Sequence, residues 1–164
     1  MKTLLFGSTL LCVLASPAHA QLRKVDDLSL PAANKLADAA MAACLAQGRH
    51  IVVTVLDRGG NIMTVQRADG VGPHNTEASR RKAYTALSTK SDTYALAVAA
   101  NANPEMRNLT TVPELLLLGG GLPLRAQGEV VGAIGVAGGG GAQQDRACAQ
   151  AALAAIPELD SPTL

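Results

Sequence analysis

The chain has 164 residues, with 14 Lys and Arg against 13 Asp and Glu, and its only aromatic residues are one Phe and two Tyr. It therefore has no excess positive charge to hold a phosphate backbone and few rings for bases to stack on, which argues against nucleic-acid binding. No apolar run reaches the roughly 20 residues of a membrane-spanning helix.

The first twenty residues predict a secretory signal peptide. Lys2 precedes an apolar run at 4–15, and residues 17–20 end in an Ala-x-Ala cleavage pattern, so the mature chain would begin at Gln21. An uncleaved anchor is the alternative, whereas a lipoprotein anchor is disfavoured because Cys12 is not next to the cleavage site. The remaining residues, 21–164, are enough for one domain. The signal peptide predicts that the protein is periplasmic or secreted.

The first half of the mature chain predicts a helix followed by a β-hairpin. Ser29 is a suitable N-cap for a helix that runs to about Gln47. Residues 50–57 are apolar on both faces, as in a central strand, and residues 62–67 return after a glycine turn.

The second half predicts helices, a second hairpin and a closing helix. Asn75 or Thr76 would cap a helix, and Asp145 would lie in the first turn of the last one. The predicted segments are helices at 76–88, 93–100 and 142–156, irregular chain at 101–113, strands at 122–126 and 129–136, and a frayed tail at 158–164. Tight turns between neighbouring strands predict an α+β fold with a largely antiparallel sheet flanked by helices.

Four glycines at 138–141 separate the last strand from the last helix. Backbone N–H groups at a helix N-terminus favour anions, so this loop, Arg67 and Lys82 could converge on a carboxylate. No Lys-Ser/Thr pair follows the glycines, so the loop is not a P-loop. The alternative is that the glycines only form a tight turn and that Asp145 favours the helix dipole.

Two cysteines remain after the predicted cleavage, Cys44 and Cys148, each in an apolar helical stripe. An exported protein could join them in a disulfide that closes a loop of roughly 100 residues. Two buried free thiols on separate helices are the alternative.

Four motifs in order resemble the GlcG/HbpS-like family of small heme-binding proteins over about residues 30–156. They are VLDRGGNIMTVQRADG at 55–70, SRRKAYTAL at 79–87, GGGLPL at 119–124, and GEVVGAIGVAGG at 128–139 with Asp145. Residues 115–118 depart from the family, whose members often have a proline beside the glycines.

The resemblance implies a profilin-like fold that assembles into dimers and larger rings, and heme binding in some members. The motif positions carried over are Asp57, Gly60, Arg67, Asp69, Gly70, Lys82, Thr85, Gly120, Gly121, Pro123, Gly132, Gly135, Gly138, Gly139 and Asp145. From these and the anion argument, the candidate ligand-binding residues are Arg67, Asp69, Lys82, Gly120, Gly121, Gly138, Gly139 and Asp145.

Heme iron needs a side-chain ligand in an apolar slot, and His74 and His50 are the candidates. Tyr84 and Met106 are further options. The structural alternative is that His74 is a surface residue at a helix start and His50 a strand-end residue. Covalent c-type attachment is excluded because no Cys-x-x-Cys-His occurs.

No nucleophile elbow, His-Glu-x-x-His motif or Cys–His pair occurs, so catalytic residues stay unassigned. Asp57 and Asp69 flank the first hairpin as a conceivable acid/base pair, although Asp beside Gly is typical of turns. The sequence predicts an exported protein that binds heme non-covalently. It is expected to form a homo-oligomer, because its small apolar side chains each bury little area. An enzyme or accessory protein for a small organic acid, and a structural or partner-binding module, remain the alternatives.

Overall fold

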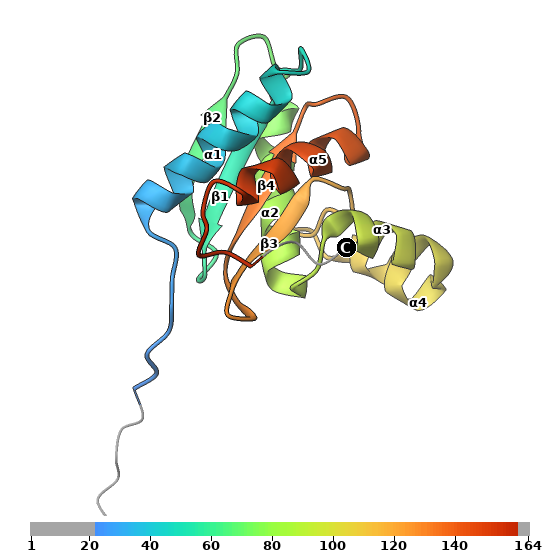
Figure 1. Cartoon of the computed structure of the whole chain (residues 1–164). Coiled ribbons are helices and arrows are strands. Elements are labelled where there is room, and N and C mark those ends of the chain that lie inside the picture. Colours follow the sequence, from blue (N-terminus) through green and yellow to red (C-terminus); the bar gives the residue numbers. More distant parts are fainter. Residues whose placement is uncertain (1–21, 161–164) are drawn as a thin grey trace, which may run out of the picture.

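The computed structural model describes residues 22–160 as a four-stranded sheet between helices (Figure 1). The predicted signal peptide at 1–20 lies outside the described residues. The elements are α1 (Leu30–Leu45), β1 (Val52–Asp57), β2 (Ile62–Arg67), α2 (His74–Thr89), α3 (Thr93–Ala102), α4 (Pro104–Arg107), the 3₁₀ turn η1 (Asn108–Thr111), β3 (Gly121–Ala126), β4 (Glu129–Ala137) and α5 (Ala142–Leu153).

The sheet has the strand order β2-β1-β4-β3, and every neighbouring pair is antiparallel. Val52 pairs with Arg67 of β2 on one side and with Ala137 of β4 on the other. β1 is thus a central strand, as its two apolar faces predicted. The α+β class and the largely antiparallel sheet are confirmed.

The two faces of the sheet are covered differently. α1 and α5 lie side by side on one face, while α2 covers the other and α3 and α4 project to the side (Figure 1). Alternating residues of the central strands divide between these layers. Val55 and Ile134 pack in the main core with α1 and α5, and Leu56 and Ala133 pack beneath α2.

α2 lies directly on the backbone of β3 and β4, because glycines face it there. A Cβ atom on Gly135 would overlap the carbonyl oxygen of Ser79 and lie 2.6 Å from the amide nitrogen of Ala83. A Cβ on Gly121 would lie 2.7 Å from the carbonyl carbon of Lys82. Any larger residue would push the helix off the sheet.

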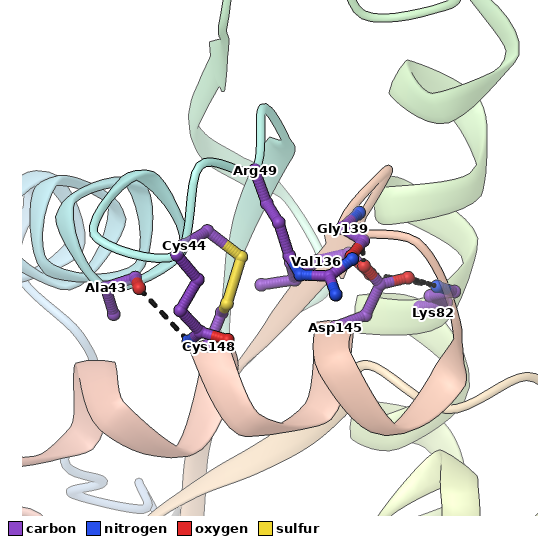
Figure 2. The surroundings of a disulfide bond; sticks show 9 residues. Ala43, Cys44, Arg49, Lys82, Val136, Gly139, Asp145 and Cys148 are labelled. Atoms are coloured by element: carbon purple, nitrogen blue, oxygen red, sulfur yellow. Dashed lines mark hydrogen bonds and ion pairs between the residues drawn. A yellow bond between two sulfur atoms is a disulfide. The ribbon is translucent and has the colours of Figure 1, made fainter.

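A disulfide joins Cys44 at the end of α1 to Cys148 in α5, across 104 positions of sequence (Figure 2). Both cysteines are fully buried between the two helices. The predicted pairing is therefore confirmed, and the alternative of two free thiols is not seen.

The expected boundaries need small corrections. β1 begins at Val52 rather than at 50, and α2 begins at His74, with Pro73 in place of the expected side-chain cap. The last helix ends at Leu153, and the segment expected to be irregular contains α4 and η1. None of the described helices is long and apolar enough to cross a membrane.

The expectation of a frayed tail is wrong for its first part. Both carboxylate oxygens of Asp160 accept hydrogen bonds from the turn between β3 and β4, from the amides of Gln127 (3.1 Å) and Gly128 (2.8 Å). Both turn residues have positive φ. The tail therefore supplies acceptors for both amides of this turn. Residues 161–164 lie outside the described part.

Candidate functional site

Lys82 of α2 and Asp145 of α5 form an ion pair beneath the glycine loop, with 2.7 Å between Nζ and Oδ2 (Figure 2). Lys82 Nζ also donates to the carbonyl of Val136 at 3.0 Å, and Asp145 Oδ1 accepts from the amide of Gly139 at 2.7 Å. Lys82 is 1% exposed and Asp145 is 4% exposed. The pair thus ties α2, the end of β4 and α5 together inside the protein.

Gly120 and Gly121 complete this sealed cluster. A Cβ on Gly120 would lie 2.5 Å from the Val136 oxygen and 3.1 Å from Lys82 Nζ. The structure therefore brings together five of the residues expected to bind a ligand, namely Lys82, Gly120, Gly121, Gly139 and Asp145. A ligand could reach the ammonium group only by displacing the partners that already bind it.

Two surface hollows lie near the glycine loop, and Arg49 and His50 line both of them. The first is a cavity of about 460 Å³ against the end of α1, with Met41, Leu45 and Ile51 among its apolar walls. The second is a cavity of about 380 Å³ walled by backbone at 70–72 and 138–140. We call these together the Arg49–His50 groove; an apolar hollow with a few polar groups is typical of ligand sites.

Arg49 connects the groove to the glycine loop. Its guanidinium donates to the carbonyl oxygen of Gly139. Sequence reasoning missed this residue. The available signal was a basic side chain between Gly48, which ends a helix, and His50, which precedes a central strand.

His50 is oriented by the loop that follows β2. Its Nδ1 lies 3.0 Å from the backbone oxygen of Asp69, and the side chain is exposed to the groove. A carbonyl oxygen only accepts hydrogen bonds, so Nδ1 must carry the proton. In the neutral imidazole Nε2 then keeps its lone pair, which is the arrangement found in metal-binding histidines.

The other predicted ligand residues lie around the rim or elsewhere. Arg67 is exposed and donates to the carbonyl of Val71, and Asp69 is exposed beside His50. Gly138 lines the second compartment. His74 is exposed at the start of α2, where a Cβ on Gly72 would lie 3.1 Å from its Cε1.

Two further iron-ligand candidates lie away from the groove. Tyr84 lines a separate hollow of about 310 Å³ beside the β1–β2 turn. Met106 lies in α4, on the part that projects from the sheet.

Asp57 and Asp69 are not brought together, because they lie at opposite ends of the β1–β2 hairpin. The Asp57 carboxylate accepts from the amide of Asn61 at 2.8 Å and from its side-chain nitrogen. Partial burial raises the pKa of Asp57, but these hydrogen bonds outweigh it and hold the pKa below its ordinary value. Asp57 therefore acts as a turn residue. No group of three or more His, Cys, Asp or Glu within 22–160 could hold a metal ion.

Known proteins are similar to this chain over most of its length. The family model of the haem-degrading protein HbpS-like family matches residues 28–154. An uncharacterized 15.0 kDa protein of the dhaT-dhaS intergenic region of Citrobacter freundii is 36% identical over 139 residues, which cover 84% of this chain and 97% of that protein.

Two solved structures are similar in both fold and sequence. A double mutant of HbpS from Streptomyces reticuli superposes with a TM-score of 0.78 at 38% identity, covering 87% of this chain and 97% of that one. The complex of PduOC with heme gives a TM-score of 0.74 at 26% identity, with coverage of 84% and 99%. The chain therefore belongs to the HbpS-like haem-degrading protein family.

Proposed function

We propose that this protein binds heme non-covalently in the Arg49–His50 groove. The proposal rests on the position of the His50 imidazole. This side chain lines both compartments, and its Nδ1 is hydrogen-bonded to the backbone carbonyl of Asp69. Nε2 is then the nitrogen offered to a ligand. The similarity to PduOC, which was solved with heme, supports this choice of ligand.

The two compartments match the two kinds of surface on heme. The apolar walls around Met41, Leu45 and Ile51 suit the face of the porphyrin ring. Arg49 has five N–H donors, and only one hydrogen bond from its guanidinium is present among the described residues, so donors remain for a propionate. The neighbouring glycines let a carboxylate approach the backbone closely.

Each group has a distinct task in this site. His50 would hold the iron and Arg49 would pair with a propionate, while Asp69 fixes the imidazole through its backbone oxygen. Heme supplies redox chemistry when it is bound. His50 and Leu45 are exposed, so part of the ring would stay in contact with solvent or with another subunit.

Hemin titration tests the proposal, with His50→Ala and His74→Ala as a matched pair. Both histidines are exposed and neither belongs to the core, so neither change should unfold the protein. We expect a saturable Soret shift at micromolar wild-type and His74→Ala protein, and its loss in His50→Ala. No saturable shift in the wild type would end the heme proposal, and an unchanged shift in His50→Ala would end the assignment of His50.

The polar compartment alone also suits a small organic acid, because Arg49 and the glycine backbone face it. This second candidate predicts that glycolate raises the melting temperature and that Arg49→Met removes the effect. Stabilisation by glycolate without hemin binding would favour it. A response to neither ligand would favour a partner-binding module.

We propose that the chain is exported and cleaved before Gln21. The n-region, apolar run and Ala-x-Ala pattern of residues 1–20 support this, as does the buried disulfide, which persists in oxidising compartments. Mass spectrometry of a periplasmic fraction would then give a chain beginning at Gln21. A mature chain that begins at Met1 would contradict it.

We also propose a homo-oligomer. β2 and β3 are the edge strands of the sheet. β2 carries two exposed apolar side chains, Ile62 (53% exposed) and Val65 (40% exposed). Exposed apolar edges of this kind are usually covered. Light scattering should give a mass at least twice that of one chain, and a monomer at micromolar concentration would contradict this.

A further inference from the structure

We infer that the Cys44–Cys148 disulfide is a positioning element of the Arg49–His50 groove, because it closes a ring of contacts that holds Arg49. The inference rests on the proposed function, since it concerns affinity at the same groove. The ring contains five residues: Cys148, Cys44, Arg49, Gly139 and Asp145 (Figure 2).

The first half of the ring runs from α5 to Arg49. The disulfide fixes Cys44, the penultimate residue of α1, against α5. The carbonyl of Cys44 accepts from the backbone amide of Arg49 at 3.1 Å. The backbone of Arg49 is therefore tied to a residue that is itself covalently fixed.

The second half returns through the glycine loop. The Arg49 guanidinium donates to the Gly139 carbonyl, and the Gly139 amide donates to Asp145 Oδ1 at 2.7 Å. Asp145 precedes Cys148 by three residues in α5, so both side chains leave the same face of that helix. The ring thereby closes on the disulfide.

Gly139 packs tightly inside this ring. A Cβ at this position would lie 2.7 Å from Asp145 Oδ1 and 3.4 Å from the sulfur of Cys44. A movement of α1 relative to α5 would therefore shift Gly139 and Arg49 together. Without the disulfide, the Arg49 guanidinium would have to be ordered on binding rather than before it, and this ordering lowers affinity.

The test compares wild-type protein with the Cys44→Ala/Cys148→Ala variant. We expect hemin to bind about tenfold more weakly to the variant, which corresponds to ordering one long side chain. We also expect faster hydrogen exchange at the Gly139 amide in ligand-free protein. Unchanged affinity together with unchanged exchange would overturn the inference.

A double-mutant cycle separates positioning from general stability. In an Arg49→Met background, removing the cysteines should cause no further loss of hemin affinity, because the positioned group is absent. A tenfold loss in that background would contradict the inference. Leu36→Ala is the matched stability control, since Leu36 is fully buried in α1 but lies outside the ring. It should leave the affinity of the folded protein unchanged, and equal weakening there would overturn the inference.

If the cysteine variant does not fold, wild-type protein reduced with a phosphine replaces it, with thiols counted after unfolding. The exchange measurement uses no ligand. If wild-type protein binds no hemin, the proposed function fails, while the exchange rate of Gly139 still decides whether the ring depends on the disulfide.

Discussion

The sealed cluster and the Arg49–His50 groove both adjoin one glycine loop, and Gly139 belongs to both. In the cluster, Lys82 is 1% exposed and bonded to Asp145. In the groove, His50 is exposed and bonded through only one ring nitrogen among the described residues. Two basic side chains beside the same glycine loop thus differ in their surroundings. Lys82 is held by protein groups inside the molecule, whereas His50 is open to solvent.

The glycines differ in the same way. Those facing α2, such as Gly135, leave room for another backbone, so a side chain there would overlap main-chain atoms. Gly138 and Gly140 instead have φ values of 102° and 94°, and turn the chain out of β4 toward the groove. Of the four changes below, the two beneath or facing α2 should destabilise the protein most, the one in the groove should destabilise it less, and the last, in the β1–β2 turn outside both regions, should have the smallest effect.

Lys82→Met should have the largest effect, a loss of about 3–5 kcal/mol in the free energy of unfolding, because it leaves a buried carboxylate without its counter-ion. Urea denaturation measures it. The Lys82→Met/Asp145→Asn variant should recover much of the loss, since Asn keeps an acceptor for the Gly139 amide. A double variant no more stable than Lys82→Met would contradict the ion-pair account.

Gly135→Ala should cost about 3 kcal/mol, because the added Cβ must force α2 away from β4. Gly48→Ala is the control: Gly48 has φ 69° and nothing within 4 Å of its Cβ position, so only about 1 kcal/mol of backbone strain is expected. Equal losses in the two variants by thermal or urea denaturation would refute the close contact between α2 and β4.

Gly140→Ala should cost only about 1 kcal/mol, again from positive φ. Its Cβ would overlap Nη1 of Arg49, the far end of a flexible side chain that can move aside. We therefore expect Gly140→Ala to lower stability only slightly but to weaken hemin binding clearly, whereas Gly135→Ala mainly lowers stability. Isothermal titration alongside denaturation separates the two, and unchanged affinity would remove Arg49 from the groove's function.

Asp57→Asn should have the smallest effect, below about 1 kcal/mol. The folded-state pKa of Asp57 is lowered, so its ionised form stabilises the protein above the unfolded-state pKa of about 3.9. This contribution is lost as the pH falls through the folded-state pKa. The difference between wild type and variant should therefore be largest above pH 5 and shrink near pH 2. A difference that grows on acidification would show the opposite sign.

Much of the fold could be predicted from the sequence, because strands, turns and helix caps are set by residues that are close together in the chain. The apolar run of β1, the tight turn between the strands expected at 122–126 and 129–136, and the capping of α1 by Ser29 each depend on neighbouring residues. The contact of Asp160 with that turn depends on residues more than thirty positions apart, and no local pattern shows it.

The candidate site was harder to predict because motifs carry no information about burial. Lys82 and Asp145 were correctly associated with the glycine loop, but only the packing of α2 on glycine shows that they satisfy each other inside the protein. Arg49 belongs to no motif identified in the sequence. Its hydrogen bond to the Gly139 carbonyl joins residues ninety positions apart in the sequence, and no local pattern shows such a contact.

Locating bound iron tests the central claim most directly. Crystals of the protein saturated with hemin should give an anomalous iron peak within bonding distance of His50 Nε2, with the porphyrin against Met41 and Leu45. A peak elsewhere, such as beside His74 or in the hollow lined by Tyr84, would contradict the assignment of the groove. So would crystals that contain no ordered iron at saturating hemin.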